Sequence, residues 1–120
     1  MQRYPFQTKH RLRNKGDFAR VFAQVEARVG RGPLLLLARR NQRTHPRLGL
    51  VVGKKHLKNA RDRNHIKRLV REHFRLRQHD IKALDIVFLS RAGCQKTTNT
   101  ELHRHLHAAF NKLSKHHAQN

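Results

Sequence analysis

The feature that most constrains this chain is the stretch 59–78, whose apolar and basic side chains separate onto two sides of a helix. At about 100° per residue, apolar positions fall on one arc and cations on the opposite arc. Like charges at this spacing destabilise an isolated helix, so the apolar arc must gain stability from burial. The stretch therefore predicts a long helix with one face in a core and one face offered to anions. The apolar arc comprises Ile66, Leu69, Val70, His73, Phe74 and Leu76, and the basic arc comprises Arg63, Asn64, Lys67, Arg68, Arg71 and Arg75.

The charge of the chain points to a polyanionic partner. Its 120 residues, the length of one domain, carry 28 Lys and Arg against 7 Asp and Glu, for a formal charge of +21. Nucleic acid fits better than a membrane, because the longest apolar run, 34–38, is strand-sized. The start of the chain lacks the apolar stretch of a signal peptide, and the single cysteine, Cys94, suits a reducing compartment. We therefore expect a cytoplasmic protein that consists of one RNA-binding domain, 1–120.

The order of predicted elements indicates an α/β (α+β) two-layer sandwich. Strands are predicted at 34–39 and 48–52, where they would form a hairpin, and at 85–89, where a continuous apolar run predicts a central strand. A basic arm is predicted over 1–13, followed by a helix from Gly16 that is capped by Asp17 and ends before 30–33. The long helix covers 59–78. A last helix begins at the capping box Thr98–Glu101 and is followed by a frayed tail, 115–120; its inward residues are Leu102, Leu106, Ala109, Phe110 and Leu113.

Motifs for metal or thiol chemistry are weak. His103 and His107 have the spacing of a zinc pair, but Arg104 stands where such an enzyme would have a Glu. Cys94 has no Cys-x-x-Cys partner, and the seven carboxylates form no visible cluster. We therefore expect no metal site and no catalytic residue in this protein.

Three segments together resemble a known family, the protein subunit of bacterial ribonuclease P. They are 18–22, 47–55 (Arg-Leu-Gly-Leu-Val-Val-Gly-Lys-Lys) and 63–71 (Arg-Asn-His-Ile-Lys-Arg-Leu-Val-Arg). The resemblance extends from about Arg11 to Phe110. One position departs from it: His65 stands where the family usually has Arg, so one phosphate contact would be weaker and pH-dependent.

The resemblance implies a ribonucleoprotein endonuclease that removes the 5′ leader of precursor tRNA. A large catalytic RNA would perform the hydrolysis with magnesium ions bound mainly by that RNA. The protein alone would be inactive and would require no protein partner and no membrane. The family fold has a left-handed crossover around the long helix, and three strands before that helix where the pattern here gives two.

The resemblance also implies which residues bind RNA. Arginine can hold phosphate oxygens with two parallel bonds, and an aromatic ring can stack on any base. Each of these assignments has an alternative. Phe18 and Phe22 could instead belong to the core, and Lys54 and Lys55 could form an ordinary polar turn. The basic face of the long helix could simply be exposed to solvent. The implied RNA-binding residues are Arg11, Arg13, Lys54, Lys55, Arg61, Arg63, Asn64, His65, Lys67, Arg68, Arg71 and Arg75, and the implied leader cleft comprises Phe18, Phe22, Arg63, Lys67 and Arg71.

Two other classes of protein share some of these features. A structural RNA-binding protein, such as a ribosomal protein, would have similar charge but would not alter tRNA cleavage. A stand-alone nuclease would cut without added RNA. A membrane-active basic helix would need a broad Trp and Phe face, which this chain lacks.

Overall fold

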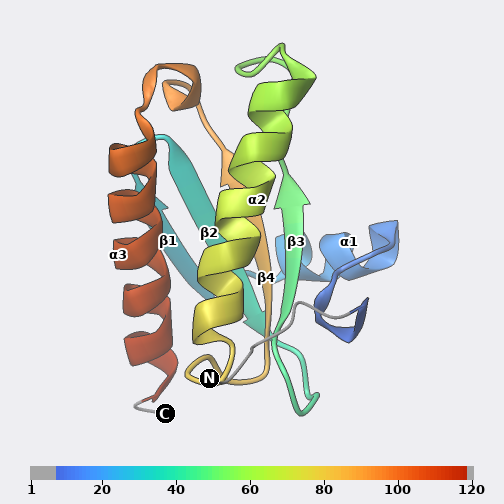
Figure 1. Cartoon of the computed structure of the whole chain (residues 1–120). Coiled ribbons are helices and arrows are strands. Elements are labelled where there is room, and N and C mark those ends of the chain that lie inside the picture. The colour runs from blue at the N-terminus through green and yellow to red at the C-terminus, as the bar shows by residue number, and fades with distance from the viewer. Residues whose placement is uncertain (1–7, 119–120) are drawn as a thin grey trace.

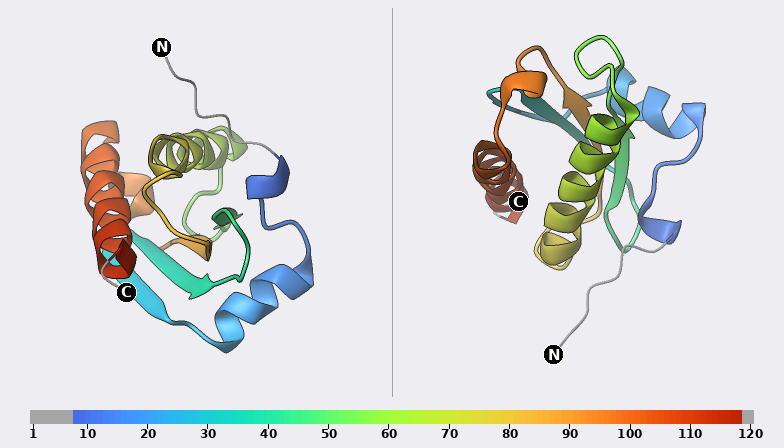
Figure 2. Two further views of the ribbon diagram at one scale, coloured as in Figure 1. Left: turned by 90° about the horizontal axis from the view of Figure 1, so that it is seen from below. Right: turned by 45° about the horizontal axis from the view of Figure 1, so that its top comes forward.

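The computed structural model describes residues 8–118 as a four-stranded sheet with two helices on one face and one helix across the other (Figures 1 and 2). This confirms the predicted mixed α+β domain. The elements are η1 (Thr8–His10), α1 (Lys15–Ala23), β1 (Ala27–Arg31), β2 (Leu34–Arg40), β3 (Arg47–Val51), α2 (Ala60–Arg77), β4 (Leu84–Ser90), η2 (Cys94–Lys96) and α3 (Asn99–Ala118).

The order of strands in the sheet is β1-β2-β4-β3, so the predicted hairpin between β2 and β3 is wrong. β4 lies between them, antiparallel to β2 and parallel to β3. Its apolar run is buried on both faces, and such a strand belongs in the centre of a sheet, as predicted. β3 is consequently an edge strand.

The connection from β3 through α2 to β4 is a crossover between parallel strands. In Figure 1 both strands run upward, α2 descends in front of the sheet, and β4 lies to the left of β3. This is the left-handed sense, which the family resemblance implies and which is rare among such connections.

The first helix is shorter than predicted and has a different cap. Asn14, not Asp17, caps α1, and its side chain accepts a hydrogen bond of 2.9 Å from the Asp17 backbone N–H. The helix ends at Ala23, and the missing third strand, β1, follows it and pairs with β2. The alternation of buried and exposed residues in β1 is only five residues long and has Gly30 within it, so the sequence pattern was too weak to reveal it.

The two remaining helices begin as predicted. The Asn59 side chain caps α2, and a reciprocal pair of hydrogen bonds between Thr98 and Glu101 opens α3. The predicted inward residues of α3 are all buried, as are Ile66, Val70 and Phe74 of α2. Leu76 is an exception: it is 52% exposed, because the sheet and α3 cover a narrower arc of α2 than the pattern suggested.

The described part of the predicted basic arm packs against the sheet rather than extending from it. Arg11 forms a parallel bridge with Leu48 on the outer edge of β3, and the Leu12 side chain is buried. Residues 1–7 of that arm lie outside the described residues. At the other end α3 continues to Ala118, into the predicted frayed tail, and residues 119–120 are not described. No helix within residues 8–118 has the length and hydropathy needed to cross a bilayer.

A buried ion pair joins two residues that lie opposite each other near the start of the two parallel strands. Arg47 of β3 donates to both carboxylate oxygens of Asp85 of β4, at 2.8 and 2.7 Å, and its Nη2 lies 3.6 Å from Asp17 of α1. All three side chains are at least nine-tenths buried. The pair fixes the register of β3 against β4 and attaches α1 to both.

Replacing Arg47 should therefore be costly. In Arg47→Met, Asp85 and Asp17 remain buried without their cation, which should lower the free energy of unfolding by about 3–5 kcal/mol. Urea denaturation measures the change. Arg104→Met removes an exposed cation from α3 and should change stability by less than about 0.5 kcal/mol. Equal effects for the two variants would contradict the structural role of the pair.

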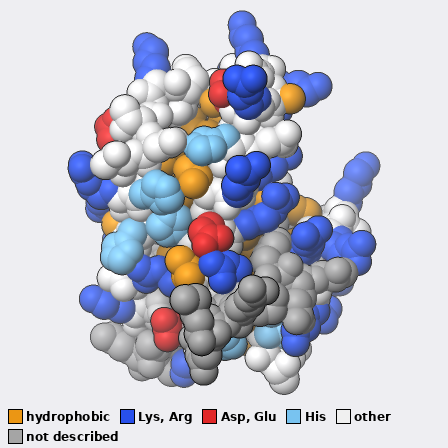
Figure 3. Space-filling view, in the orientation of Figure 1, with side chains coloured by type: hydrophobic (Ala, Val, Ile, Leu, Met, Phe, Trp, Pro, Cys, Tyr) orange, Lys and Arg blue, Asp and Glu red, His pale blue; other side chains and the backbone are white. Residues whose placement is uncertain are grey.

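Helices α2 and α3 are joined on their outer side by histidines, which gather between the two helices in Figure 3. His73 and His103 form a hydrogen bond of 2.9 Å, and His107 bonds to Arg77 at 2.6 Å. Burial, followed by the charges of His103, Arg77 and His107, lowers the pKa of His73 to about 4, against a weaker opposing effect of Glu72. His73 is therefore neutral in the folded protein at neutral pH.

This pKa predicts a pH dependence of stability. Between pH 6.5 and about 4 the unfolded chain binds a proton at His73 that the folded protein does not, so stability should fall as pH falls through that window. His73→Gln, which cannot titrate, should reduce the slope. Urea midpoints measured from pH 7.5 to 4.5 for both proteins test this, and parallel curves would contradict it.

Candidate nucleic-acid interface

The outer face of α2 carries a shallow hollow of about 400 Å³ lined by side chains on consecutive turns. Four of its five lining residues were predicted to bind RNA. The fifth, Glu72, pairs with Arg75 through an Nε–Oε2 bond of 3.3 Å, and this pairing lowers the pKa of Glu72 and raises that of Arg75. Arg75 is therefore partly neutralised within the protein. The lining residues are Asn64, Arg68, Arg71, Glu72 and Arg75.

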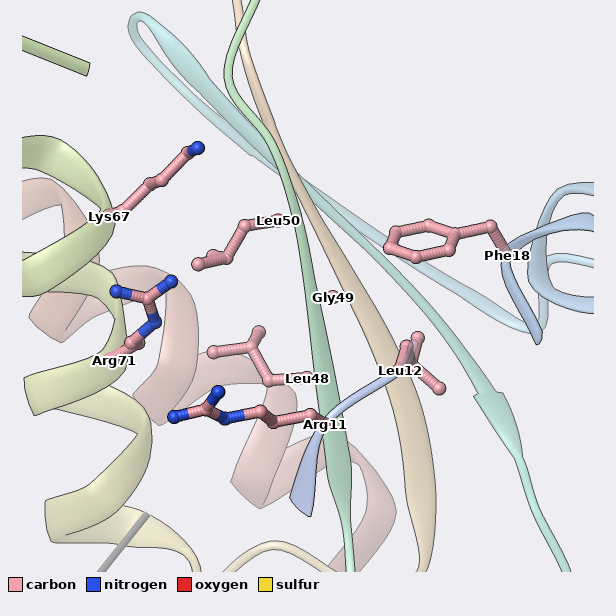
Figure 4. Close-up of a pocket in the computed structure, with 8 residues that line it drawn as sticks. All are labelled: Arg11, Leu12, Phe18, Leu48, Gly49, Leu50, Lys67 and Arg71. Atoms are coloured by element: carbon pink, nitrogen blue, oxygen red, sulfur yellow. The ribbon is translucent and has the colours of Figure 1, made fainter. Parts of the chain in front are cut away.

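A second hollow, of about 180 Å³, crosses the edge strand β3 (Figure 4). Lys67 and Arg71 extend toward it from α2, Arg11 from the N-terminal segment, and Phe18 from α1 on the far side of the strand. Three cations and one aromatic ring thus come from three separate segments. The floor consists of Leu12, Leu48, Gly49 and Leu50.

The cations at this hollow are close enough to influence one another. Partial burial lowers the pKa of Arg71, and the positive charge of Arg11 lowers it further. A guanidinium remains charged at neutral pH despite such a shift. The hollow therefore concentrates positive charge that an anion would neutralise.

Gly49 is what allows Phe18 to lie against the sheet. A Cβ atom at this position would lie 2.6 Å from two ring atoms of Phe18 and 3.1 Å from the Cβ of Leu12. Neighbouring Leu48 and Leu50 point toward α2. Gly49, which has no side chain, therefore faces α1 and leaves room there. The glycine sets how closely α1 approaches the cleft.

The aromatic pair is divided between packing and exposure. Phe18 is half-buried and packs beside the Val21, Leu35 and Val87 cluster, whereas Phe22 is 46% exposed. Both rings line a broad apolar hollow of about 460 Å³ with Arg13 and Val51, next to the hollow across β3. The alternative that both rings belong to the core therefore fails for Phe22 and holds in part for Phe18. We use the name leader groove, after the role that the family resemblance leads us to expect, for the two adjoining hollows lined by Phe18, Phe22, Arg11, Lys67 and Arg71.

Five predicted site residues lie outside these hollows, and two of them, Arg63 and His65, bond to other parts of the protein. The Arg63 guanidinium donates to the carbonyl oxygens of Leu57 and Lys58, at 2.8 and 2.9 Å, and so stabilises the loop before α2. It lines neither hollow. His65 faces the start of α3, where its Nε2 lies 2.7 Å from Asn99 Oδ1. Lys54, Lys55 and Arg61 are exposed around the start of α2, as expected of phosphate contacts and equally of a polar turn.

The histidines of α3 do not converge. His103 meets His73, His107 meets Arg77, and the His105 ring covers Gly32, where a Cβ would come within 2.9 Å of it. Among the side chains that the structure describes, residues 9–115, no three of His, Cys, Asp or Glu are grouped to hold a metal ion. Burial raises the pKa of the Cys94 thiol, which disfavours the reactive thiolate.

Several groove residues were not predicted from the sequence as site residues. Apart from Lys15 they are uncharged, and even those in the predicted strand 48–52 carry no pattern that marks a binding site, because the groove forms only where α1, the segment after η1 and α2 meet around β3. Gly49 was the one with a detectable signal, a glycine within an apolar strand. The missed residues are Leu12, Asn14, Lys15, Ala19, Leu48, Gly49, Leu50 and Val51.

The fold and this surface define a small α+β protein with a polycationic helix beside an aromatic groove. Comparisons with known proteins agree with that class. The family model for ribonuclease P matches residues 6–114. The ribonuclease P protein component of Chromohalobacter salexigens is 44% identical over 110 residues, which cover 92% of this chain and 86% of the relative. That of Photobacterium profundum is 42% identical over 115 residues, covering 96% and 97%.

Solved structures give the same result. The Staphylococcus aureus RNase P protein superposes with a TM-score of 0.79 at 30% identity, covering 86% of this chain and 94% of that one. The Thermotoga maritima RNase P protein gives a TM-score of 0.72 at 32% identity, covering 88% and 96%. The chain belongs to the family of ribonuclease P protein components. This makes it a subunit of a ribonuclease and implies a role in processing the tRNA 5′ leader.

The close contact at Gly49 gives a test of the groove. Gly49→Ala should displace Phe18 and cost about 1–3 kcal/mol of stability. Gly53→Ala is the matched control, because a Cβ there meets only the Lys55 backbone at 4.0 Å. Guanidinium unfolding measures both. Adding Phe18→Ala to Gly49→Ala should recover part of the loss, and purely additive effects would show that the two residues do not interact.

Proposed function

We propose that this protein binds the catalytic RNA of ribonuclease P through the outer face of α2 and holds the 5′ leader of precursor tRNA in the leader groove. The observation that carries the proposal is the convergence of Arg11, Lys67 and Arg71 with the ring of Phe18 around one hollow. A single-stranded leader offers phosphates and unstacked bases, and this groove offers cations and aromatic rings.

The contribution to binding is electrostatic. Each phosphate that a Lys or Arg neutralises releases counterions, and on single strands log K then falls by roughly 0.7 per neutralised phosphate for each tenfold rise in salt. Figure 3 shows cations along the flank of α2 toward β3 and α1. Catalytic RNA and precursor tRNA repel each other, and a polycation beside both reduces that repulsion. Contacts to the leader favour precursor over mature tRNA, so the product can leave.

The groove binds leaders of different sequence. Exposed Phe22 and half-buried Phe18 present ring faces on which any base can stack. Lys67 and Arg71 supply charge to the phosphates without reading bases. Affinity in this groove therefore depends on the leader being single-stranded and anionic.

Catalysis is assigned to the RNA, with magnesium ions bound by that RNA. All seven carboxylates lie within the described residues, and five have structural partners there. A protein-bound magnesium site would need several grouped carboxylates, which these residues do not provide. The protein requires no protein partner for this role and would act in the cytoplasm. The five partnered carboxylates are Asp17 and Asp85 with Arg47, Glu26 with Arg40, Glu72 with Arg75, and Glu101 at the α3 cap.

Cleavage of a leader-bearing tRNA at low magnesium tests the subunit role. The catalytic RNA alone should be slow, the protein alone should be inert, and the two together should restore cleavage. Cleavage by the protein alone would mean that an active site was overlooked. No effect in any combination would favour a structural RNA-binding role instead.

Binding measurements test the groove. Phe22→Ala should weaken precursor affinity by about 1–3 kcal/mol, and Lys67→Ala should reduce the salt slope by about 0.7, while mature tRNA binding stays unchanged. Lys112→Ala, which removes an exposed cation of α3, is the control and should alter neither. Equal losses for precursor and mature tRNA would disprove the leader assignment.

A further inference from the structure

A fourth hollow, of about 180 Å³, lies on the α1 face of the sheet, where β2 ends and the 41–46 loop begins. It shares no lining residue with the leader groove or with the hollow on α2. None of its lining side chains is aromatic or aliphatic. They are Arg20, Arg39, Arg40, Asn41, Gln42, Arg43, Arg47 and Asp85.

Two of the five arginines have their charge matched within the protein. Arg47 is paired with Asp85 and Asp17, and Arg40 lies 3.3 Å from Glu26. Arg20 lies 4.0 Å from Asp17, a carboxylate already held by Arg47. Arg39 and Arg43 have no carboxylate within ion-pair distance among the described residues. The hollow therefore keeps a surplus of positive charge.

Hydrogen bonds hold the Arg39 side chain and the loop backbone that carries Arg43. Arg39 donates from Nη1 to the Arg20 carbonyl oxygen at 3.1 Å, which holds its guanidinium against α1. Asn41 donates to Asp85 Oδ1 at 3.0 Å and to the His45 carbonyl at 3.1 Å, and it accepts from the Arg43 backbone N–H at 2.8 Å. The loop is thereby tied to the buried ion pair.

The loop also contains a strained residue. Gln42 has a φ of 58°, the only positive φ of a non-glycine residue within the described chain. Such a conformation persists only where the surrounding structure imposes it. Here the bonds of Asn41 on one side and the turn to Arg43 on the other impose it, and they set the position from which the Arg43 side chain extends.

We infer that this hollow, the Arg39–Arg43 pocket, binds a phosphate group of the RNA backbone. Guanidinium groups from α1, β2 and the 41–46 loop can surround tetrahedral oxygens with paired donors. The pocket offers no aromatic ring on which a base could stack, and its charged groups favour phosphate oxygens. The inference rests on the proposed RNA partner but concerns a hollow with its own lining residues, and it adds a phosphate contact to those of α2.

The test uses full-length protein and Arg39→Gln/Arg43→Gln. Arg104→Gln/Lys112→Gln is the matched control, which removes the same charge from exposed positions of α3. Arg43→Gln alone is the second variant, because its exposed side chain can change without loss of the fold. Affinity is measured over a salt series, for catalytic RNA with the protein and for precursor tRNA with the holoenzyme. Inorganic phosphate is titrated separately while the arginine Nε–H signals are followed by NMR.

The double variant should bind one of these RNAs about tenfold more weakly, with a salt slope reduced by about 0.7 for each phosphate that is no longer neutralised, and the control should retain both. The RNA whose affinity falls identifies the source of the phosphate. A response to inorganic phosphate without any change in RNA affinity would overturn the inference, since the pocket would then take only a free oxyanion. Equal behaviour of double variant and control would overturn it as well. Lys67→Ala acts through the leader groove, so its effect on precursor binding would survive either failure.

Discussion

The structure depends on one buried ion pair. Arg47 and Asp85 lie opposite each other near the start of the two parallel strands. Their contact, with Asp17 added from α1, holds β3 against β4, which lies between β2 and β3. A pair of this kind does not necessarily raise net stability relative to an apolar replacement, but breaking it leaves a buried charge. Its value is specificity: it selects one strand order and one register. Asn41, bonded to the same Asp85, extends that control to the 41–46 loop.

The protein uses most of its few carboxylates to organise itself, and the consequence is its surface. Five of the seven are occupied by the buried pair, surface pairs or a helix cap. Seven carboxylates cannot balance 28 Lys and Arg side chains, so the protein keeps a large surplus of positive charge. A domain with such a surplus repels itself, and a polyanion relieves that repulsion. Folding and RNA binding are in this sense coupled through charge.

The leader groove exists because β3 is an edge strand. Were β3 paired with β2 in a hairpin, α1 and α2 would not meet across one strand, and Phe18 would not lie opposite Lys67 and Arg71. Gly49 completes the arrangement by leaving room for the Phe18 ring. The same edge position leaves the flank of β3 to Arg11, which brings a third cation to the groove.

The sequence by itself determined whatever depends on neighbours along the chain. The two-faced pattern of α2, the capping box of α3, the apolar run of β4 and the charge surplus all follow from local spacing or composition. Family resemblance added the left-handed crossover and four of the groove residues, Phe18, Phe22, Lys67 and Arg71. Only the tertiary structure decided the strand order and the existence of β1. It also decided that Arg63 bonds to loop carbonyls, that His65 bonds to α3, and that Phe22 and Leu76 are exposed. These depend on which distant segments pack together, and a buried pair such as Arg47–Asp85, 38 residues apart, has no periodicity to reveal it.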